Sequence, residues 1–480
     1  MTERKTLGLT IALAVIGVFV TYVPITSVSV ALATIRQDTH AATSDLQWVT
    51  DAYIIPMAAA ILSAGVFGDL HGRRKVYVIG MALTALGAVI AVLADTTTGA
   101  SALHVLWAGQ AVSGLGAGLL LPTTLALIAH AVPDLHARAK YVALWATGMV
   151  LGLSVGPLIS GVILEGAGWG WIFAPVAVLA LGTGVLAHRA LPESRAPAGR
   201  RLDWPGQVLA TVAITASIFG VIEGGDSGWG DPTTLAALAL GAVTFVLFIG
   251  FELRAPAPLL DVRLFRVPAF AASGFAALIA LFALVGSIFL LSVFFGADQH
   301  LSPLEIGYRL LFINLVTAVV NPFAGRAMHR VQPIGALTFG LGLGAVAMLL
   351  LCGLGDDASF GASAWRLAVL GFANAFMLSA VAVAAIHAVP HRLAGMAAAA
   401  NTALRQYGAA LGPAVLGVIL TSRMAGGATM ATAMHTALVV NAIALAVAAL
   451  ACAAVVIRQA SVAEPVDDLQ GEADLEAVSL

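Results

Sequence analysis

The chain has 480 residues, of which 60% are hydrophobic and only 10% are charged, and its formal net charge is −2. A soluble domain carries roughly 25% charged residues, so this chain lacks the polar residues needed to cover a water-facing globule. The composition identifies an integral membrane protein. The balanced charge also excludes the basic face on which nucleic-acid binding depends, so we expect the lipid bilayer, and no nucleic acid, as a partner.

Long apolar runs follow one another along almost the whole chain. A helix needs about 20 apolar residues to cross the roughly 30 Å hydrocarbon core of a bilayer. The runs that meet this criterion predict an all-α integral membrane protein with about 14 transmembrane helices. They cover residues 9–33, 46–68, 76–95, 103–129, 139–164, 170–188, 206–223, 234–252, 269–295, 305–325, 333–353, 366–388, 395–421 and 432–457.

The distribution of Lys and Arg between the predicted loops indicates the orientation of the helices. If the N-terminus lies inside, eighteen of these residues fall in inside segments and four in outside segments. Cytoplasmic loops carry such an excess of positive charge. We therefore expect a multi-pass protein of the cell (inner) membrane with both termini in the cytosol.

A dense group of charges separates the second and third apolar runs, in the sequence GVFGDLHGRRK at 65–75. Its residues Gly65, Asp69, Gly72, Arg73 and Arg74 follow the spacing G-x-x-x-D-x-x-G-R-R. A positive-inside loop accounts for the basic residues but not for the acid at a helix end or for the ordered glycines. Glycine can supply the backbone conformation of the tight turn that so short a loop requires.

Three further stretches stand out, together with an internal repeat. They are WVTDAY at 48–53, GLSVGPLISG at 152–161 and LDWPGQ at 202–207. The segment GPLISGVIL at 156–164 reappears as GPAVLGVIL at 412–420. A repeat of this kind indicates two related helical bundles, with substrate handled between them.

The charged loop resembles the signature loop of the major facilitator superfamily. The other stretches resemble the start of helix 2, the antiporter motif of helix 5 and the loop before the extra helix pair in its fourteen-span drug–proton antiporter branch. The resemblance implies a major-facilitator-type fold of two six-helix bundles plus two extra helices. It divides the chain into a first bundle (1–190), a linker with two extra helices (191–268), a second bundle (269–457) and an acidic cytosolic tail (458–480).

The resemblance implies a secondary active transporter, not an enzyme, that exports hydrophobic or amphipathic small molecules by alternating access and proton antiport. It assigns the charged loop to conformational switching, as a latch of the inner gate. It assigns the glycine groove of helix 5 to a seal between the bundles against ion leak. We expect a monomer without cofactor or metal. The groove residues are Gly152, Gly156, Pro157 and Gly161.

Two positions depart from the pattern of this branch. Helix 1 commonly carries a membrane-embedded aspartate, where this chain has Pro24, and helix 4 an arginine, where it has Gln110. Both departures weaken the inference of proton coupling and of cationic substrates. Asp51 remains as the clearest acid within a span, and is the candidate for proton coupling. The alternative role for Asp51 is that of a helix-capping or interfacial carboxylate.

Other polar residues within the spans are candidates for a substrate cavity. Charges in a membrane are costly and therefore mark functional sites by default, and Arg405 lies in the middle of the thirteenth predicted helix. Polar residues can also simply join helices, which is the expectation for any single asparagine. The candidates are Gln110, Asn314, Arg405 and Gln406, with Asn321, Asn374 and Asn441 as further hydrogen-bonding groups.

Two other functions remain open at this point. One is a narrow-specificity or proton-independent facilitator of a single metabolite on the same fold, which the missing acid of helix 1 favours. The other is a membrane-embedded enzyme, which would need a cluster of acids, bases or metal ligands. The sequence contains no HExxH, GxSxG, Walker or DxD-like pattern, so the enzyme is the remote alternative.

Overall fold

The computed structural model describes residues 2–132, 134–194, 203–256, 258, 260–328, 330–355, 358–390 and 393–477. These residues form α-helices joined by short loops and two short 3₁₀ helices, with no strand among them. The elements are α1 (Thr2–Thr39), α2 (Thr43–His71), α3 (Arg73–Ala94), α4 (Gly99–Ala131), α5 (Leu135–Leu164), η1 (Trp169–Phe173), α6 (Ala174–Ala190), α7 (Trp204–Asp226), α8 (Pro232–Glu252), η2 (Val262–Arg266), α9 (Pro268–Ala297), α10 (Pro303–Ala327), α11 (Pro333–Leu351), α12 (Phe360–His387), α13 (Ala394–Ala425) and α14 (Met430–Ala477).

The helices have the length and composition of membrane spans. Thirteen of them qualify singly, and α2 qualifies when its two segments, Thr43–Ile61 and Ser63–His71, which are bent by 55° relative to each other, count as one span. This confirms the predicted all-α membrane fold with about 14 spans.

Polar residues in the short loops fix where several helices begin. The Asp231 carboxylate accepts hydrogen bonds from the backbone N–H groups of Thr233 and Thr234, and so caps α8. Ser302 and Glu305 form a reciprocal capping box at the start of α10. Such caps satisfy backbone donors that have no partner within the helix. They hold the helix ends in place where the chain reverses direction.

The first bundle consists of α1–α6, in which α3 packs along α4, α2 along α4, and α1 along α5. Glycines bring these backbones close together. A Cβ on Gly87 would collide with the Gly109 carbonyl oxygen, and one on Gly116 would collide with the Gly80 carbonyl oxygen. Small residues permit this tight packing, which is a main source of helix association in lipid.

The second bundle consists of α9–α14, with α9 at its centre, in contact with α10, α11, α12, α13 and α14. The α7–α8 hairpin is added outside the two bundles, and α7 contacts both α2 and α13. The Gln207 side chain donates a 2.5 Å hydrogen bond to the Ala59 carbonyl oxygen of α2, and Ser217 hydrogen bonds with Tyr407 of α13 at 3.0 Å. The two extra helices therefore flank the seam between the bundles.

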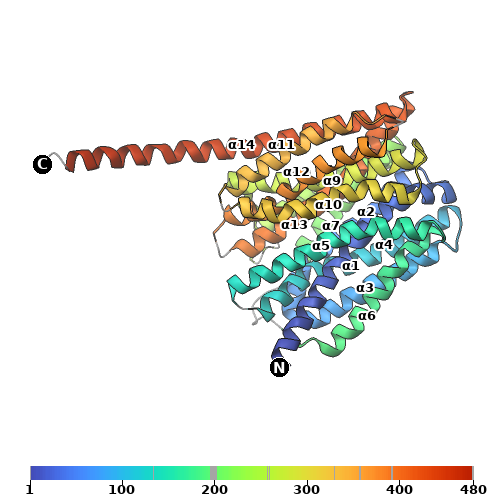
Figure 1. Cartoon of the computed structure of the whole chain (residues 1–480), viewed down its shortest axis with the longest axis horizontal. Helices are drawn as coiled ribbons and strands as arrows, with labels where there is room; N and C mark the ends of the chain where they lie inside the picture. The colour runs from blue at the N-terminus through green and yellow to red at the C-terminus, as the bar shows by residue number, and fades with distance from the viewer. Residues whose placement is uncertain are drawn as a thin grey trace.

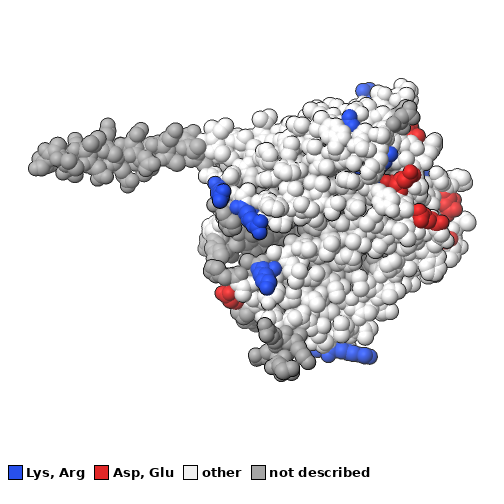
Figure 2. Space-filling model, viewed as in Figure 1, with Lys and Arg blue, Asp and Glu red and all other residues white. Residues whose placement is uncertain are grey.

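The two bundles lie side by side, and both ends of the chain lie toward the same end of the molecule (Figure 1). The division at residues 190, 268 and 457 stays a prediction. Within the predicted linker, 195–202, 257 and 259 lie outside the described residues, as do the last three residues of the predicted tail. On the face shown in Figure 2, most Asp and Glu lie at the end away from the chain termini, whereas Lys and Arg lie at both ends.

The excess of Lys and Arg in the segments predicted to lie inside leads to a prediction about sidedness. In a variant without Cys352 and Cys452, single cysteines at Thr98 and Ser227 should react with an impermeant thiol reagent on intact cells. Cysteines at His71 and Gln332 should react only after the cells are opened, because all four positions are exposed at helix ends or in loops, on opposite sides of the bundle. Labelling in the reverse pattern would contradict cytosolic termini.

Candidate functional site

A cavity lies between the two bundles at mid-height of the helices. In the conformation described here the cavity is small, with a volume of about 40 Å³. Its lining is mostly apolar and comes from both bundles, as expected of a site for small molecules. The apolar lining includes Ile25, Ile54 and Leu153 of the first bundle and Leu284, Ile288 and Leu378 of the second.

A few polar side chains interrupt this apolar lining. Asn314, Arg405 and Gln406 all line the cavity, so the structure brings together three of the four side chains proposed from the sequence. Asn374 of α12 and Tyr22 of α1 join them. Tyr22 was missed by the sequence analysis. Its spacing of four and seven residues from Thr26 and Ser29, which line the same cavity, is the helical signal that could have found it.

The amide groups of the cavity are already used to hold helices together. Asn314 donates to the Leu153 carbonyl oxygen at 3.0 Å and so joins α10 to α5. Gln406 donates to the Met57 sulfur at 3.4 Å and joins α13 to α2. In contrast, the guanidinium of Arg405 makes no hydrogen bond or ion pair with any residue that the structure describes.

Close packing of α13 against α9 fixes the position of Arg405. A Cβ on Gly408 would collide with the Leu278 carbonyl oxygen, and one on Gly412 with that of Phe282. Gly286 of α9 lies directly against Gly412. The two backbones are thus in contact one to two turns beyond Arg405, which leaves little freedom for the helix that carries this residue.

The two bundles also touch directly on the side of the cavity away from the chain termini. A Cβ on Gly161 would lie 2.8 Å from Cα of Leu304 at the start of α10. A Cβ on Gly307 would lie 2.8 Å from the Pro157 carbonyl oxygen. Gln47, near the start of α2, donates to the Ala414 carbonyl oxygen of α13 at 3.4 Å.

The glycine groove of α5 therefore serves two neighbours. The sequence analysis expected the whole groove at the interface between the bundles. Gly152 and Gly156 instead face α1 of the same bundle, where a Cβ on Gly152 would lie 2.7 Å from the Phe19 carbonyl oxygen. Of the four groove residues, Pro157 and Gly161 at the far end are the ones that lie against α10 of the second bundle. The reason is that α5 packs along α1 as well as α10.

Asp51 is fully buried on α2, and neither of its carboxylate oxygens has a hydrogen-bond partner among the described residues. Gln47 and Met57, which come before and after it on the same helix, both contact α13 of the other bundle. A buried charge without partners is very costly. Asp51 thus lies on the stretch of α2 that faces the second bundle, in surroundings that offer its charge no compensation.

Gln110 does not line the cavity, contrary to its proposed role there. Its side chain is buried and donates a 3.1 Å hydrogen bond to the Val49 carbonyl oxygen. It therefore joins α4 to α2 within the first bundle. A glutamine within a span has no water to satisfy its amide, so a backbone carbonyl of the neighbouring helix takes this place.

The charged loop between α2 and α3 is held by several interactions. Arg73 pairs with Asp69 one turn earlier, at 3.0 Å, and donates to the Ala126 carbonyl oxygen of α4 at 3.2 Å. Gly72 has a φ of 104°, a backbone conformation that side chains disfavour. Gly65 lies further back on α2, where a Cβ would meet nothing within 4 Å.

Glu193, just after α6, completes this loop and was missed by the sequence analysis. Its carboxylate accepts hydrogen bonds at 3.2 Å from the backbone N–H groups of Arg74 and Ser194 and lies 3.6 Å from the Arg74 side chain. A Cβ on Gly72 would collide with this carboxylate. No spacing pattern pointed to Glu193, because 119 residues separate it from Arg74.

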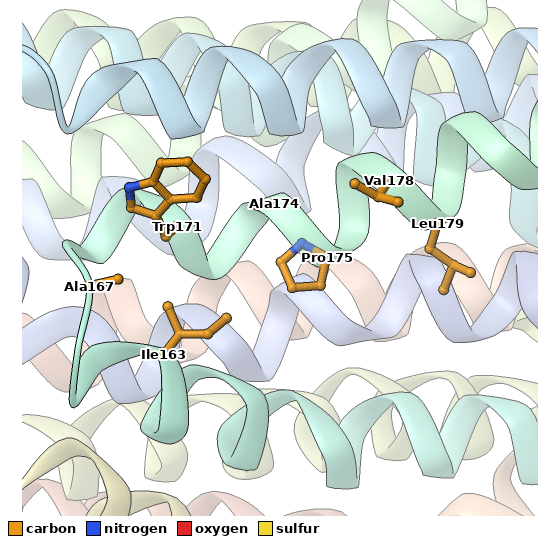
Figure 3. Close-up of a pocket in the computed structure, with 7 residues that line it drawn as sticks. All are labelled: Ile163, Ala167, Trp171, Ala174, Pro175, Val178 and Leu179. Carbon is orange, nitrogen blue, oxygen red and sulfur yellow. The ribbon is translucent and has the colours of Figure 1, made fainter.

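A second hollow lies on the outer surface, where α5 ends and η1 and α6 begin (Figure 3). Its lining is apolar throughout, and the side chains of Trp171 and Val178 are 55% and 73% exposed. Such a surface suits contact with lipid tails, and this hollow shares no residue with the cavity between the bundles. The lining residues are Ile163, Ala167, Trp171, Ala174, Pro175, Val178 and Leu179.

Comparison with protein families gives the fold and the cavity a context. The family model of the Major Facilitator Superfamily matches residues 14–413, most of the chain. The chain belongs to the major facilitator superfamily. As a member of this superfamily it is a membrane transporter and not an enzyme.

Curated relatives of this transporter are similar along most of their length. The multidrug resistance protein Stp of Mycobacterium tuberculosis is 31% identical over 87% of this chain and 77% of its own. The methylenomycin A resistance protein of Bacillus subtilis is 29% identical over 87% of this chain and 88% of its own. The tetracenomycin C resistance and export protein of Streptomyces glaucescens is 28% identical over 86% of this chain and 76% of its own.

A solved structure shares the fold of this transporter. A POT family transporter crystallised in complex with 5-aminolevulinic acid superposes with a TM-score of 0.70 over 93% of this chain and 95% of its own. The identity is only 12%, so the likeness concerns the fold alone.

The packing of the α2–α3 loop leads to a prediction about its glycines. Gly72→Ala should lower the free energy of unfolding by about 1–3 kcal/mol, because it forces a strained backbone conformation and a collision with Glu193. Gly65→Ala is the matched control and should be neutral or slightly stabilising, since its Cβ meets open space and Ala favours a helix. The measurement is the thermal unfolding midpoint of each purified variant. Equal midpoints would show that the Gly72 contact is unimportant.

Proposed function

We propose that this transporter exports hydrophobic or amphipathic small molecules, such as drugs, antibiotics or metabolites, by proton antiport. It acts as a monomer in the bacterial cytoplasmic membrane with both termini in the cytosol. The named relatives support export, since their names refer to multidrug, methylenomycin A and tetracenomycin C resistance.

The cavity between the bundles is the observation that carries this proposal. Its lining comes from both bundles, is mostly apolar, and contains a few hydrogen-bonding groups. Such a lining favours molecules that also partition into membranes, because burial of apolar area is roughly additive and non-directional. Movement of one bundle against the other would expose the same residues alternately to the two sides, as in other transporters with repeated bundles.

The charged loop and the α5 groove suit the two gates of such a cycle. Contacts of Pro157 and Gly161 with α10 close the side away from the termini. The loop at 65–75 lies at the other side, where Asp69 and Arg73 form an ion pair. The two side chains are only 13% and 17% exposed, and even a contribution of about 1 kcal/mol is enough to shift a balance between two conformations that differ by a few kcal/mol.

Asp51 is the proposed proton carrier. In the conformation described here its carboxylate is buried without a partner, and protonation would remove the uncompensated charge. Because the contacts of Gln47 and Met57 with α13 flank it, separation of α2 from α13 would open a path for water to this side chain. Proton uptake and release would then follow the movement of the bundles.

Replacement of Asp51 tests the proton antiport. In proteoliposomes with an imposed pH gradient, wild-type protein should accumulate an apolar fluorescent drug against its concentration gradient. Asp51→Asn should abolish this accumulation but retain exchange of the drug between equal concentrations, because the cavity itself is unchanged. Asp45→Asn is the control, since this acid of the same helix only accepts the N–H of Ala42 at the helix start.

The outcomes separate the candidate mechanisms. Gradient-driven accumulation by Asp45→Asn but not by Asp51→Asn supports antiport through Asp51. Wild-type transport that ignores the pH gradient would instead favour the proton-independent facilitator. Full gradient-driven transport by Asp51→Asn would exclude this residue as the carrier.

A further inference from the structure

Arg405 is the one cationic side chain that lines the cavity among the described residues. It is the twelfth residue of α13, about 16 Å along the helix axis from the first residue, which is close to the middle of the membrane. A guanidinium at this depth is costly and is normally paired. Yet no Asp or Glu belongs to the described lining, and Arg405 forms no ion pair with a described residue.

The donor groups of Arg405 are therefore available to a ligand. A guanidinium carries five N–H donors in a planar fork that fits an oxyanion. The side chain is partly exposed, toward the cavity that it lines. In a water-excluding cavity, a charge-assisted hydrogen bond to a carboxylate is about twice as strong as a neutral one.

Tyr22 supplies a second donor from the opposite bundle. Its phenol lies close enough to Arg405 to interact with it electrostatically, and both residues line the cavity. The amide groups of Asn314 and Gln406, which are uncharged, each already donate one hydrogen bond, to the Leu153 carbonyl oxygen and to the Met57 sulfur. Arg405 of one bundle and Tyr22 of the other therefore both present donors to the same cavity, where a ligand's anionic group could reach them.

The same arrangement disfavours cations. A cationic amphiphile would enter a cavity whose described lining has no carboxylate and one positive charge. Asp51, the nearby acid on α2, is buried outside this lining. Like charges in a low-dielectric environment repel strongly, so the cavity selects against molecules with an ammonium group.

We infer that the cavity binds amphipathic molecules that carry an oxyanion, such as a carboxylate or phenolate, with Arg405 and Tyr22 holding the oxyanion and the apolar lining holding the body. This inference rests on the proposed export function and specifies its substrate class. The oxyanion bridges α1 of the first bundle and α13 of the second. Its binding would therefore favour conformations in which both groups face the cavity.

Three probes with the same fluorescent body test the inference: pyrenebutyrate, its neutral amide and pyrenebutylammonium. Their binding to the full chain in lipid nanodiscs is followed by energy transfer from the protein's tryptophans, with empty nanodiscs subtracted. Wild-type protein should bind the carboxylate about tenfold more tightly than the amide, and the ammonium most weakly. Tyr22→Phe should weaken binding of the carboxylate a few-fold, about as expected for one lost hydrogen bond.

Variants of Arg405 provide the decisive comparison. Arg405→Gln should reduce carboxylate affinity to that of the amide and leave the amide within about twofold, since apolar burial is unchanged. Arg405→Lys should retain part of the preference, because it keeps the charge but loses the fork. Arg423→Gln, on the same helix but in an exposed position outside the cavity, should match wild type. Unchanged elution and unfolding midpoints verify that the variants fold.

The possible results separate this inference from the export function. A carboxylate preference that disappears in Arg405→Gln supports the oxyanion site. Equal affinity for all three probes, or a preference that survives Arg405→Gln, overturns it while the exporter stands. If the wild type binds none of the probes, including the neutral amide, the cavity is not a substrate site. That result overturns the proposed function and this inference with it.

Discussion

The bilayer offers no water to satisfy polar groups, and this constraint governs the whole structure. Backbone groups are satisfied inside helices, many Ser and Thr hydroxyl groups donate to a carbonyl of their own helix, and several amide side chains bond to a neighbouring helix. Gln110 donates to α2, Asn441 donates to the Ala283 carbonyl oxygen of α9, and Asn374 donates to Thr317 of α10. A structural role accounts for these side chains, because each one joins two helices. A polar residue left without such a bond requires another explanation.

Asp51 and Arg405 are the two ionisable groups of this second kind on which the proposed mechanism depends. One is a buried acid without a partner among the described residues, and the other is a cation that lines a cavity. Each would be destabilising if its only role were structural. A reversible partner resolves the difficulty in both cases, since a proton neutralises the acid and an oxyanion compensates the guanidinium. Whether a polar side chain within a span has a hydrogen-bond partner therefore distinguishes structural residues from candidate functional residues better than its polarity alone.

The architecture could be predicted well from the sequence because one strong effect, the burial of apolar helices in the bilayer, determines it. Apolar runs of about 20 residues specify spans, and the charged loop and the glycines specify local turns and close contacts such as Gly72 beside Glu193. The site was less predictable, since it depends on which helix faces meet. Gln110 and Asn314 are both amides within spans, yet only Asn314 faces the cavity. Nothing local in the sequence distinguishes them, and the same holds for Glu193, which is distant along the chain from the loop that it supports.

The placement of the two unpaired charges suggests how proton and substrate influence each other. Asp51 is on α2 and Arg405 is on α13, and these helices touch through Gln47 with Ala414 and Met57 with Gln406. A movement that separates α2 from α13 changes the surroundings of both charges at once. Two ligands that each prefer one arrangement of the same pair of helices are coupled thermodynamically, and the coupling is reciprocal. No separate pathway between the two sites is needed. The interface between α2 and α13 has two arrangements, and binding of either the proton or the substrate would shift the equilibrium between them.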